Sequence, residues 1–318
     1  MMALKVLLHS PLSLVSQARK DDYEEATRGF GIALFAGTQE KAKDDLEVAL
    51  QHTKKYWRIS WGWQAGKCTN KVTGVAMWLD KSYYRKQDML RWEAPPRDLA
   101  GRGGFLATRG GAAELLLGVL YFPPRPKDNT KMGYKDTLKG LFKWWDAMMK
   151  EHSRRRAVIV GMDLNDLLGM RKVAGQWVEP DGQHVGQFGA GKQGAAADML
   201  VDFMNKWELK ALNTMVPAGS TYFGSNGAES RIDFIVTNMH VEPMACSTLA
   251  GLGKKVQLIP TRAPRDHRPL YAKFKIDQLK RYYGEGPRAG TRTGSWRASE
   301  EEKAGRTSWS RWRRAWPA

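Results

Sequence analysis

The sequence predicts an α/β fold, in which helices pack on the faces of β-sheets. Apolar segments of strand length alternate along the chain with longer segments of helical periodicity, and this alternation is typical of layered α/β domains. With 318 residues, 42% of them hydrophobic, the chain is long enough to bury a sizeable core. The sequence has no internal repeat, which argues against solenoids and propellers.

Seven short segments dominated by apolar residues carry the strand prediction. They are 4–8, 32–36, 72–79, 115–121, 157–160, 231–236 and 269–274. The first leaves an alternative open, because residues 1–18 combine a Lys, a short apolar stretch and small residues as a signal segment does. His9 and Pro11 interrupt that stretch, which favours the strand.

Three segments show helical periodicity, namely 41–53, 131–152 and 195–207. In the longest, Leu138, Leu141 and Trp145 recur at three- and four-residue steps, which places them on one face of a helix. Segment 169–194 is rich in Gly and Gln and predicts a long loop, either functional or disordered.

The net charge of +18 is the strongest pointer to a partner. It favours a polyanion, with nucleic acid ahead of an anionic membrane surface, although a generally basic protein is the simpler alternative. No window reaches the roughly 18 apolar residues of a membrane-spanning helix. The only two cysteines, Cys68 and Cys246, cannot build a disulfide framework, which fits an intracellular protein, nuclear or cytoplasmic.

The C-terminal part differs from the rest in composition. Residues 277–318 are rich in Arg, Gly, Ser and Trp and carry a net charge of +5, which leaves +13 on residues 1–276. We expect residues 1–276 to form the folded domain and residues 277–318 to be a basic, disordered tail. Interleaved Arg and Trp suits single-stranded nucleic acid, and an extension without a function of its own is the alternative.

Polar residues follow two of the predicted strands. Glu40 comes just after strand 32–36, where α/β proteins commonly place active-site groups. Asp163 and Asn165 follow strand 157–160 and, two residues apart, lie on the same side of an extended chain. The carboxylates could hold a cation or take a proton, and the amide could hold a phosphate oxygen. Alternatively, Glu40 caps a helix and the Asp163–Asn165 pair forms a turn.

Asp233 lies inside an apolar strand, where a carboxylate is costly unless it is paired or faces water from an edge strand. Asp266 and His267 are adjacent and therefore point to different sides. His267 could take Asp233 as an orienting partner while Asp266 serves another role, although an isolated Asp-His pair is common by chance. Tyr121 ends a strand beside a Pro turn and, on its own, could equally be a packed core residue.

The order of these motifs resembles that of the endonuclease/exonuclease/phosphatase superfamily. Along the chain come QE at 39–40, YFPP at 121–124, GMDLN at 161–165, SRIDFI at 230–235 and DHRPL at 266–270. The sequence is most similar to the apurinic-endonuclease-like domains of non-LTR retrotransposons. The pattern of that group is also followed by segments 101–103, 184–189, 209–214 and 220–223. The resemblance covers roughly residues 3–276, and its specificity lies in the ordered set.

The resemblance implies a four-layer α/β sandwich, with two packed mixed β-sheets flanked by helices. It also implies a metal-dependent phosphodiesterase site where the loops of the sandwich meet. In that site Glu40 would be the chief ligand of Mg²⁺ or Mn²⁺, and Asp266 would assist it.

The resemblance also implies a role for each remaining motif residue. Asp163 would align or deprotonate the attacking water, and Asn165 would hold a phosphate oxygen. His267, oriented by Asp233, would stabilise the scissile phosphate, and Tyr121 would help to place it. Hydrolysis of a phosphodiester needs such a nucleophile and such charge stabilisation.

Three positions depart from the family pattern. Ser10 stands where the first strand normally ends in Asn, Met162 separates Gly161 from Asp163, and Arg265 replaces the usual Ser before Asp266. Ser10 matters most, because a serine is shorter than Asn and offers no amide.

The sequence therefore predicts a Mg²⁺-dependent DNA endonuclease of retrotransposon type that nicks DNA and leaves a 3′-hydroxyl. One alternative is a phosphatase or exonuclease of the same superfamily, which the charge disfavours because a small substrate needs less of it. The other is a catalytically degraded nucleic-acid-binding module, as Ser10 and the tail suggest. DNA is the expected partner, with no membrane contact.

Overall fold

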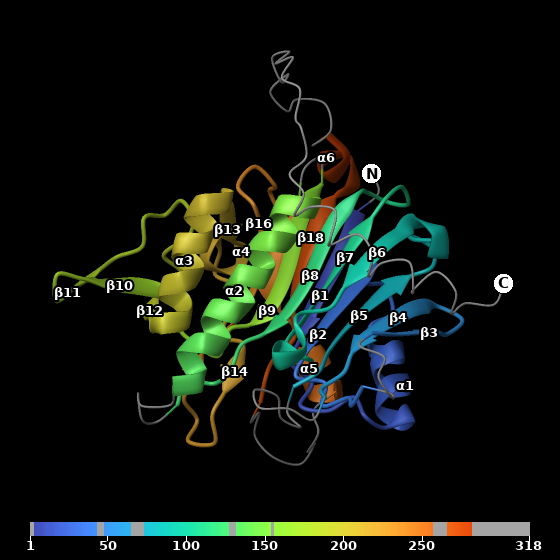
Figure 1. Cartoon of the computed structure of the whole chain (residues 1–318), viewed down its shortest axis with the longest axis horizontal. Coiled ribbons are helices and arrows are strands. Elements are labelled where there is room, and N and C mark those ends of the chain that lie inside the picture. The colour runs from blue at the N-terminus through green and yellow to red at the C-terminus, as the bar shows by residue number, and fades with distance from the viewer. Residues whose placement is uncertain are drawn as a thin grey trace, which may run out of the picture. The chain divides into compact units, whose positions relative to one another are not determined.

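The computed structural model describes residues 3–42, 48–64, 73–126, 132–153, 156–256 and 266–281. In this part of the chain two large mixed sheets pack face to face, and helices cover both outer faces (Figure 1). The predicted four-layer α/β sandwich is confirmed. None of the described helices is long and apolar enough to cross a bilayer.

The first large sheet has seven strands. Its order is β17 (Ala245–Thr248), β18 (Leu270–Lys275), β1 (Ala3–His9), β2 (Ile32–Ala36), β5 (Val75–Asp80), β4 (Tyr56–Trp61) and β3 (Ala49–His52). Only the β1–β2 pairing is parallel. Helices α1 (Gln17–Ala26) and α5 (Ala250–Val256) contribute to the apolar cluster on its outer face.

The second large sheet has six strands. Its order is β13 (Leu209–Ala211), β16 (Asp233–Asn238), β9 (Ala157–Asp163), β8 (Leu115–Tyr121), β7 (Gly103–Thr108) and β6 (Met89–Glu93). Helices α2 (Met132–His152) and α3 (Ala195–Trp207) cover its outer face, where Trp145 stacks on Phe203 with ring centroids 4.2 Å apart.

The remaining elements are short. Two small sheets contain β10 (Gly169–Val173), β11 (Gln176–Val178) and β12 (Gly191–Lys192), and β14 (Tyr222–Phe223) and β15 (Glu229–Ser230). The short helices are the 3₁₀ turns Lys86–Asp88 and Arg97–Leu99, α4 (Leu212–Met215) and α6 (Ile276–Arg281). Leu279 on α6 is buried in the main core, so this core continues a few residues past the predicted boundary at 276.

The core between the two large sheets is apolar over most of its extent. Inward side chains of β1, β2 and β5 meet those of β8, β9 and β16. Small residues allow this contact: a Cβ on Gly161 of β9 would lie 2.8 Å from Leu34 and 2.9 Å from Leu8. The sheets therefore stand in a fixed relation to each other, which matters for the site.

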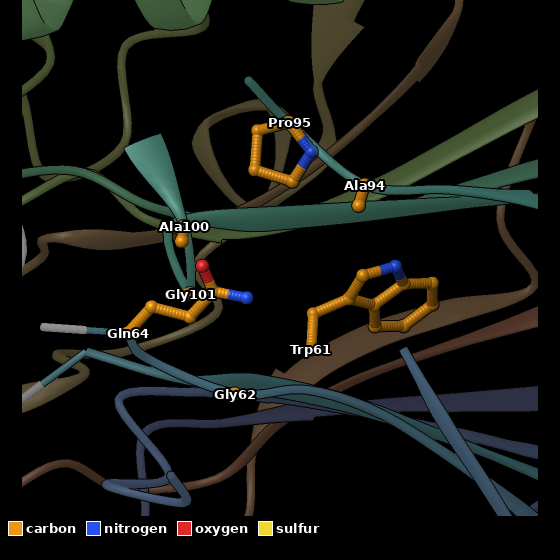
Figure 2. Close-up of a pocket in the computed structure, with 7 residues that line it drawn as sticks. All are labelled: Trp61, Gly62, Gln64, Ala94, Pro95, Ala100 and Gly101. Carbon is orange, nitrogen blue, oxygen red and sulfur yellow. The ribbon is translucent and has the colours of Figure 1, made fainter. Parts of the chain in front are cut away.

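A small pocket lies near the end of β4, where Trp61 and Gly62 face Ala100 and Gly101 (Figure 2). Gly101 has φ of 75°, a left-handed conformation that favours glycine. A Cβ on Gly104 would lie 2.2 Å from the indole of Trp61, so this glycine lets the indole lie against β7. In the Gly-Arg-Gly segment at 101–103, a Cβ on Gly103 would lie 2.5 Å from Trp144 and 2.9 Å from Leu120, so this glycine is also part of the sheet packing.

Most predicted elements are present, and two predictions are wrong. The strands predicted at 4–8, 32–36, 72–79, 115–121, 157–160, 231–236 and 269–274 correspond to β1, β2, β5, β8, β9, β16 and β18. The helix predicted at 41–53 is wrong at its end, because β3 pairs there with β4, and its residues 43–47 lie outside the described part of the chain. Segment 169–194 is not one long loop, since β10, β11 and β12 form a small sheet within it.

Candidate active site

Three neighbouring strands of the second sheet bring polar side chains to the same level. In β9, Asp163 lies opposite Tyr121 of β8 on one side and Asp233 of β16 on the other. β8 and β9 are parallel and both end here, whereas β16 begins here. The sheet register alone therefore places these three side chains side by side.

His267 reaches this row from the first sheet, three residues before β18 begins. Its Nδ1 lies 2.8 Å from Oδ2 of Asp233, and its Nε2 lies 3.8 Å from Oδ2 of Asp163. One ligand atom from each of these three residues lies within 4.8 Å of the other two. The structure thus brings together two carboxylates and an imidazole from opposite sheets.

The charges of this cluster depend on one another. Burial by itself lowers the pKa of His267, but the carboxylates of Asp233 and Asp163 outweigh it and raise that pKa to about 9. Burial raises the pKa of Asp163, although His267 opposes the shift. At neutral pH His267 is therefore a cation that donates from Nδ1 to Asp233.

A second imidazole positions the backbone of His267. Nε2 of His9 lies 3.0 Å from the carbonyl oxygen of His267, and Nδ1 of His9 lies 2.8 Å from the Tyr23 hydroxyl. Because a carbonyl only accepts, Nε2 carries the proton, and Nδ1 accepts from Tyr23. Burial lowers the pKa of His9 to about 3, so it stays neutral.

Asn165 and Tyr121 flank Asp163. Asn165 has φ of 53°, and its backbone N–H donates to Oδ1 of Asp163 over 3.1 Å. Its amide Nδ2 donates a hydrogen bond to the carbonyl of Phe122, and the Asn165 side chain also hydrogen-bonds the hydroxyl of Tyr121. Burial raises the pKa of Tyr121 to about 12, so its hydroxyl remains neutral.

Ser10 directly follows β1 and contacts Asp163. Its Oγ lies 3.1 Å from Oδ2 of Asp163 and 3.0 Å from the carbonyl oxygen of Ala36. A serine hydroxyl has one proton for these two acceptors. The residue that stands in for the family's Asn therefore lies against the predicted base.

The two predicted metal ligands lie outside the cluster. Glu40 pairs with Lys20, whose Nζ lies 2.5 Å from Oε1, and both side chains are mostly buried. Asp266 accepts a hydrogen bond from the backbone N–H of His267, 2.9 Å from Oδ1. Burial raises the pKa of Asp266, against a lowering effect of the His267 charge.

The oxygen donors at this edge suit a divalent cation by their chemistry, because Mg²⁺ and Mn²⁺ prefer carboxylates. One further feature fits: Oδ1 of Asp233 is buried and has no hydrogen-bond partner among the described residues. The Asp163–Asp233–His267 cluster could bind a metal ion. For His267 to become a ligand it would first have to lose its proton.

A second group of possible ligands, Glu93, Glu151 and His152, lies near the ends of β6 and α2. Arg91 forms ion pairs with both glutamates, at 2.5 Å from Oε1 of Glu93 and 2.7 Å from Oε1 of Glu151. One guanidinium therefore already pairs with both carboxylates and offsets one of their two negative charges.

Sequence reasoning did not identify the residues that α1 contributes. Lys20 contacts Glu40, and Tyr23 supports His9. Helix α1 has a weak apolar pattern, with only Tyr23 buried, so neither the helix nor its inward face was visible. Arg265 and the tail beyond residue 281 lie outside the described residues.

No family model and no curated protein matches the sequence. Solved structures do match. An AP endonuclease from Leishmania major is 14% identical, with a TM-score of 0.56 over 86% of this chain and 88% of the other. The 3′-5′ exonuclease NExo from Neisseria meningitidis is 15% identical, with a TM-score of 0.57 over 85% and 99%. The catalytic domain of Xenopus laevis APE2 is 11% identical, with a TM-score of 0.54 over 88% and 96%.

These likenesses show the fold. It is the fold of the endonuclease/exonuclease/phosphatase superfamily, as the ordered motifs predicted. The endonuclease domain of the retrotransposon TRAS1 also matches, but its TM-score of 0.49 is too low to bear on the type of enzyme. The retrotransposon type therefore stays a prediction.

Proposed function

We propose that this chain, which has the endonuclease/exonuclease/phosphatase fold, is a metal-dependent phosphodiesterase that nicks DNA, of the retrotransposon endonuclease type. The observation that carries the proposal is the buried pair of Asp163 and His267, 3.8 Å apart, with Asp233 hydrogen-bonded to the far side of the imidazole. A base next to an oriented cation is what attack of water on a phosphodiester requires.

Each side chain has a role in this proposal. Asp163, whose pKa burial raises, takes the proton of the attacking water. The imidazolium of His267 stabilises the charge that develops on the phosphate oxygens, and Asp233 holds its orientation. The amide of Asn165 and the neutral hydroxyl of Tyr121, which hydrogen-bond to each other without substrate, contact the phosphate.

In this proposal Glu40 and Asp266, rather than the Asp163–Asp233–His267 cluster, would hold the divalent cation, once Lys20 has left Glu40. When bound, such an ion supplies Lewis-acid stabilisation of the phosphoryl and leaving-group oxygens. Mg²⁺ is the first choice and Mn²⁺ the second, because the donors are oxygen atoms.

The charge of the chain supports a nucleic acid as substrate. Residues 1–276 carry +13, more than a small phosphorylated substrate needs. One structural neighbour is an AP endonuclease, and another is a 3′ phosphatase whose structure contains a product DNA hairpin. DNA is therefore the substrate to test first.

The test is nicking of supercoiled plasmid in Mg²⁺ and in EDTA. We expect nicking by the wild type in Mg²⁺ only, and a loss of at least about 100-fold in Asp163→Ala and in His267→Ala. Asp202→Asn, which removes an exposed carboxylate on α3, and His240→Gln are matched controls that should retain activity. Metal-dependent nicking that survives both alanine substitutions would contradict the site.

Two alternatives give different results in the same experiment. A phosphatase releases inorganic phosphate from a 3′-phosphorylated oligonucleotide without nicking the plasmid. A degraded binding module retards DNA without cutting it, and Ser10→Asn, which restores the family's amide next to Asp163, would then recover nicking.

A further inference from the structure

Lys20 and Glu40 form an ion pair that is shielded from water. Nζ of Lys20 lies 2.5 Å from Oε1 of Glu40, and the side chains are 14% and 13% exposed. The proposed function assigns this same carboxylate to the divalent cation. A pair with so little exposure is only weakly screened by solvent, so the ammonium and a metal ion at Glu40 repel each other strongly.

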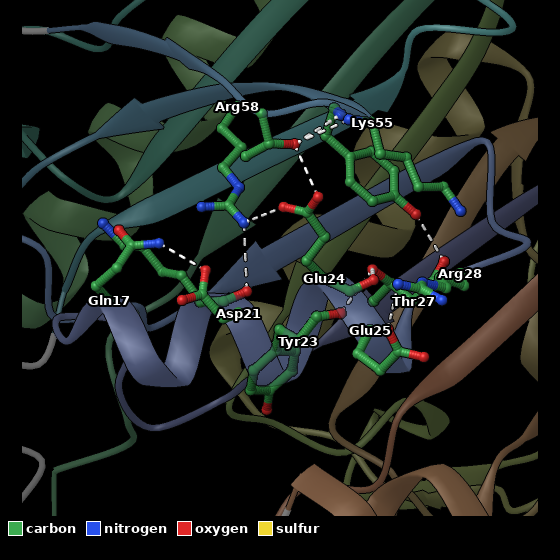
Figure 3. Close-up of polar contacts among 12 residues, drawn as sticks. Gln17, Asp21, Tyr23, Glu24, Glu25, Thr27, Arg28, Lys55 and Arg58 are labelled. Atoms are coloured by element: carbon green, nitrogen blue, oxygen red, sulfur yellow. Dashed lines mark hydrogen bonds and ion pairs between the residues drawn. The ribbon is translucent and has the colours of Figure 1, made fainter.

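The position of Lys20 is fixed by the structure around α1. The guanidinium of Arg58 on β4, which is 4% exposed, ion-pairs with Glu24 of α1, as Figure 3 shows. The same Nη2 donates to the carbonyl oxygen of Lys20 over 3.3 Å. Ser16 caps the helix by accepting from the N–H of Arg19, and Tyr23 is tied to His9. The fixed position of α1 therefore places the ammonium of Lys20 next to Glu40.

The ammonium of Lys20 nevertheless has an alternative position near Glu40. The ion pair lines a small open pocket together with Lys41, Gln51 and Ser60. Lys41 is a second cation there, and the side-chain oxygens of Gln51 and Ser60 can accept hydrogen bonds from an ammonium. The stem of lysine has four flexible carbons, so the ammonium can leave Glu40 while α1 stays in place.

We propose that Lys20 is an internal counter-ion that competes with the divalent cation for Glu40, so that metal binds only when the ammonium moves off the carboxylate. This inference rests on the proposed function for the assignment of Glu40. The apparent metal affinity is then reduced by the fraction of molecules in which Glu40 is free. The exchange also keeps the buried carboxylate neutralised in the metal-free protein.

The experiment measures Mn²⁺ binding to the full chain by the electron paramagnetic resonance signal of free Mn²⁺. We expect Lys20→Met, which keeps the length of the stem without its charge, to lower the Kd by about tenfold, corresponding to Glu40 being free about a tenth of the time. Lys55→Met is the matched control, since it removes an ammonium paired with Asp80 on the same sheet and should leave the Kd unchanged.

Thermal unfolding gives a second readout. In EDTA, Lys20→Met leaves Glu40 without a partner and should lower the Tm, and saturating Mn²⁺ should raise the Tm of this variant more than that of the wild type. Equal Kd values in wild type and Lys20→Met would overturn the proposal. The proposal would also be overturned if the gain in Mn²⁺ affinity persisted in Lys20→Met/Glu40→Gln, because the gain would then not depend on the Glu40 carboxylate.

The result is separable from the proposed function. If the protein nicks plasmid and wild type and Lys20→Met bind Mn²⁺ with equal affinity, the proposed phosphodiesterase activity is supported and the proposed role of Lys20 as a counter-ion is contradicted. Tighter Mn²⁺ binding in Lys20→Met that depends on Glu40, in a protein that nicks no DNA, would support the counter-ion and contradict the phosphodiesterase.

Discussion

At the scale of single residues, His267 is held from three sides. Asp233 binds its Nδ1, His9 binds its carbonyl oxygen, and Asp266 accepts its backbone N–H. A ring that is held this firmly cannot leave the neighbourhood of Asp163 without breaking buried hydrogen bonds. Its protonation state is therefore set by the two carboxylates rather than by solvent.

Removal of the Asp233 charge tests this control. Two carboxylates raise the pKa of His267, so the folded protein holds the proton at pH 7 and releases it only as the pH approaches about 9. In Asp233→Asn burial prevails, and the pKa should fall below that value. NMR titration of the imidazole measures the shift, and plasmid nicking at pH 7 should drop by about 100-fold. An unchanged titration would show that Asp233 does not control the ring.

The sequence predicted this pairing but not the state of Glu40. An Asp inside an apolar strand requires a partner. His267 points away from the adjacent Asp266, so the sequence predicts Asp233 as its orienting partner. The Glu40–Lys20 pair joins a helix to a loop beyond the next strand. No local pattern encodes it, because the contact depends on how α1 lies on the sheet.

At the scale of elements, α2 and α3 form the outer layer behind β9 and are joined by aromatic contacts. Trp145 is fully buried and stacks on Phe203, 4.2 Å between centroids. Their apolar periodicity was strong, which is why both helices were predicted within about one residue of their observed ends. The β3 segment is half-exposed at the sheet edge and has no such pattern, which is why the prediction of a helix there is wrong.

Trp145→Ala should therefore destabilise the protein by about 3–5 kcal/mol, because it leaves a large cavity between the two helices. Trp177→Ala is the matched control: this indole is 40% exposed on β11, and its loss should cost well under about 1 kcal/mol. Urea unfolding followed by circular dichroism measures both. Equal losses of stability would mean that the α2–α3 contact does not carry this layer.

At the scale of the whole molecule, the charge is spread over the folded part and the tail. Residues 1–276 keep +13 of the +18. A chain cut after Gly284 keeps the compact unit that includes the buried Leu279, whereas a cut after Phe274 would remove part of the core. The cut after Gly284 therefore removes most of the tail, residues 285–318, and keeps the buried core intact.

We expect the chain cut after Gly284 to bind duplex DNA with a strong dependence on salt. Phosphate contacts release counter-ions, so affinity should fall by at least about tenfold between 50 and 200 mM NaCl. Fluorescence anisotropy with a labelled duplex measures the slope, and the full-length chain is the comparison. If the shortened chain loses DNA binding altogether, the tail rather than the body supplies the affinity.

The candidate site is a seam between the two sheets. Asp163 and Asp233 belong to one sheet, while Ser10 and His267 flank strands of the other. The proposed activity therefore depends on how the two sheets are placed relative to each other. A relative shift of the two sheets by about one ångström would leave the helix and strand content unchanged, but it would already separate Asp163 from the imidazole of His267. Activity should thus fail earlier on heating than any spectroscopic sign of unfolding.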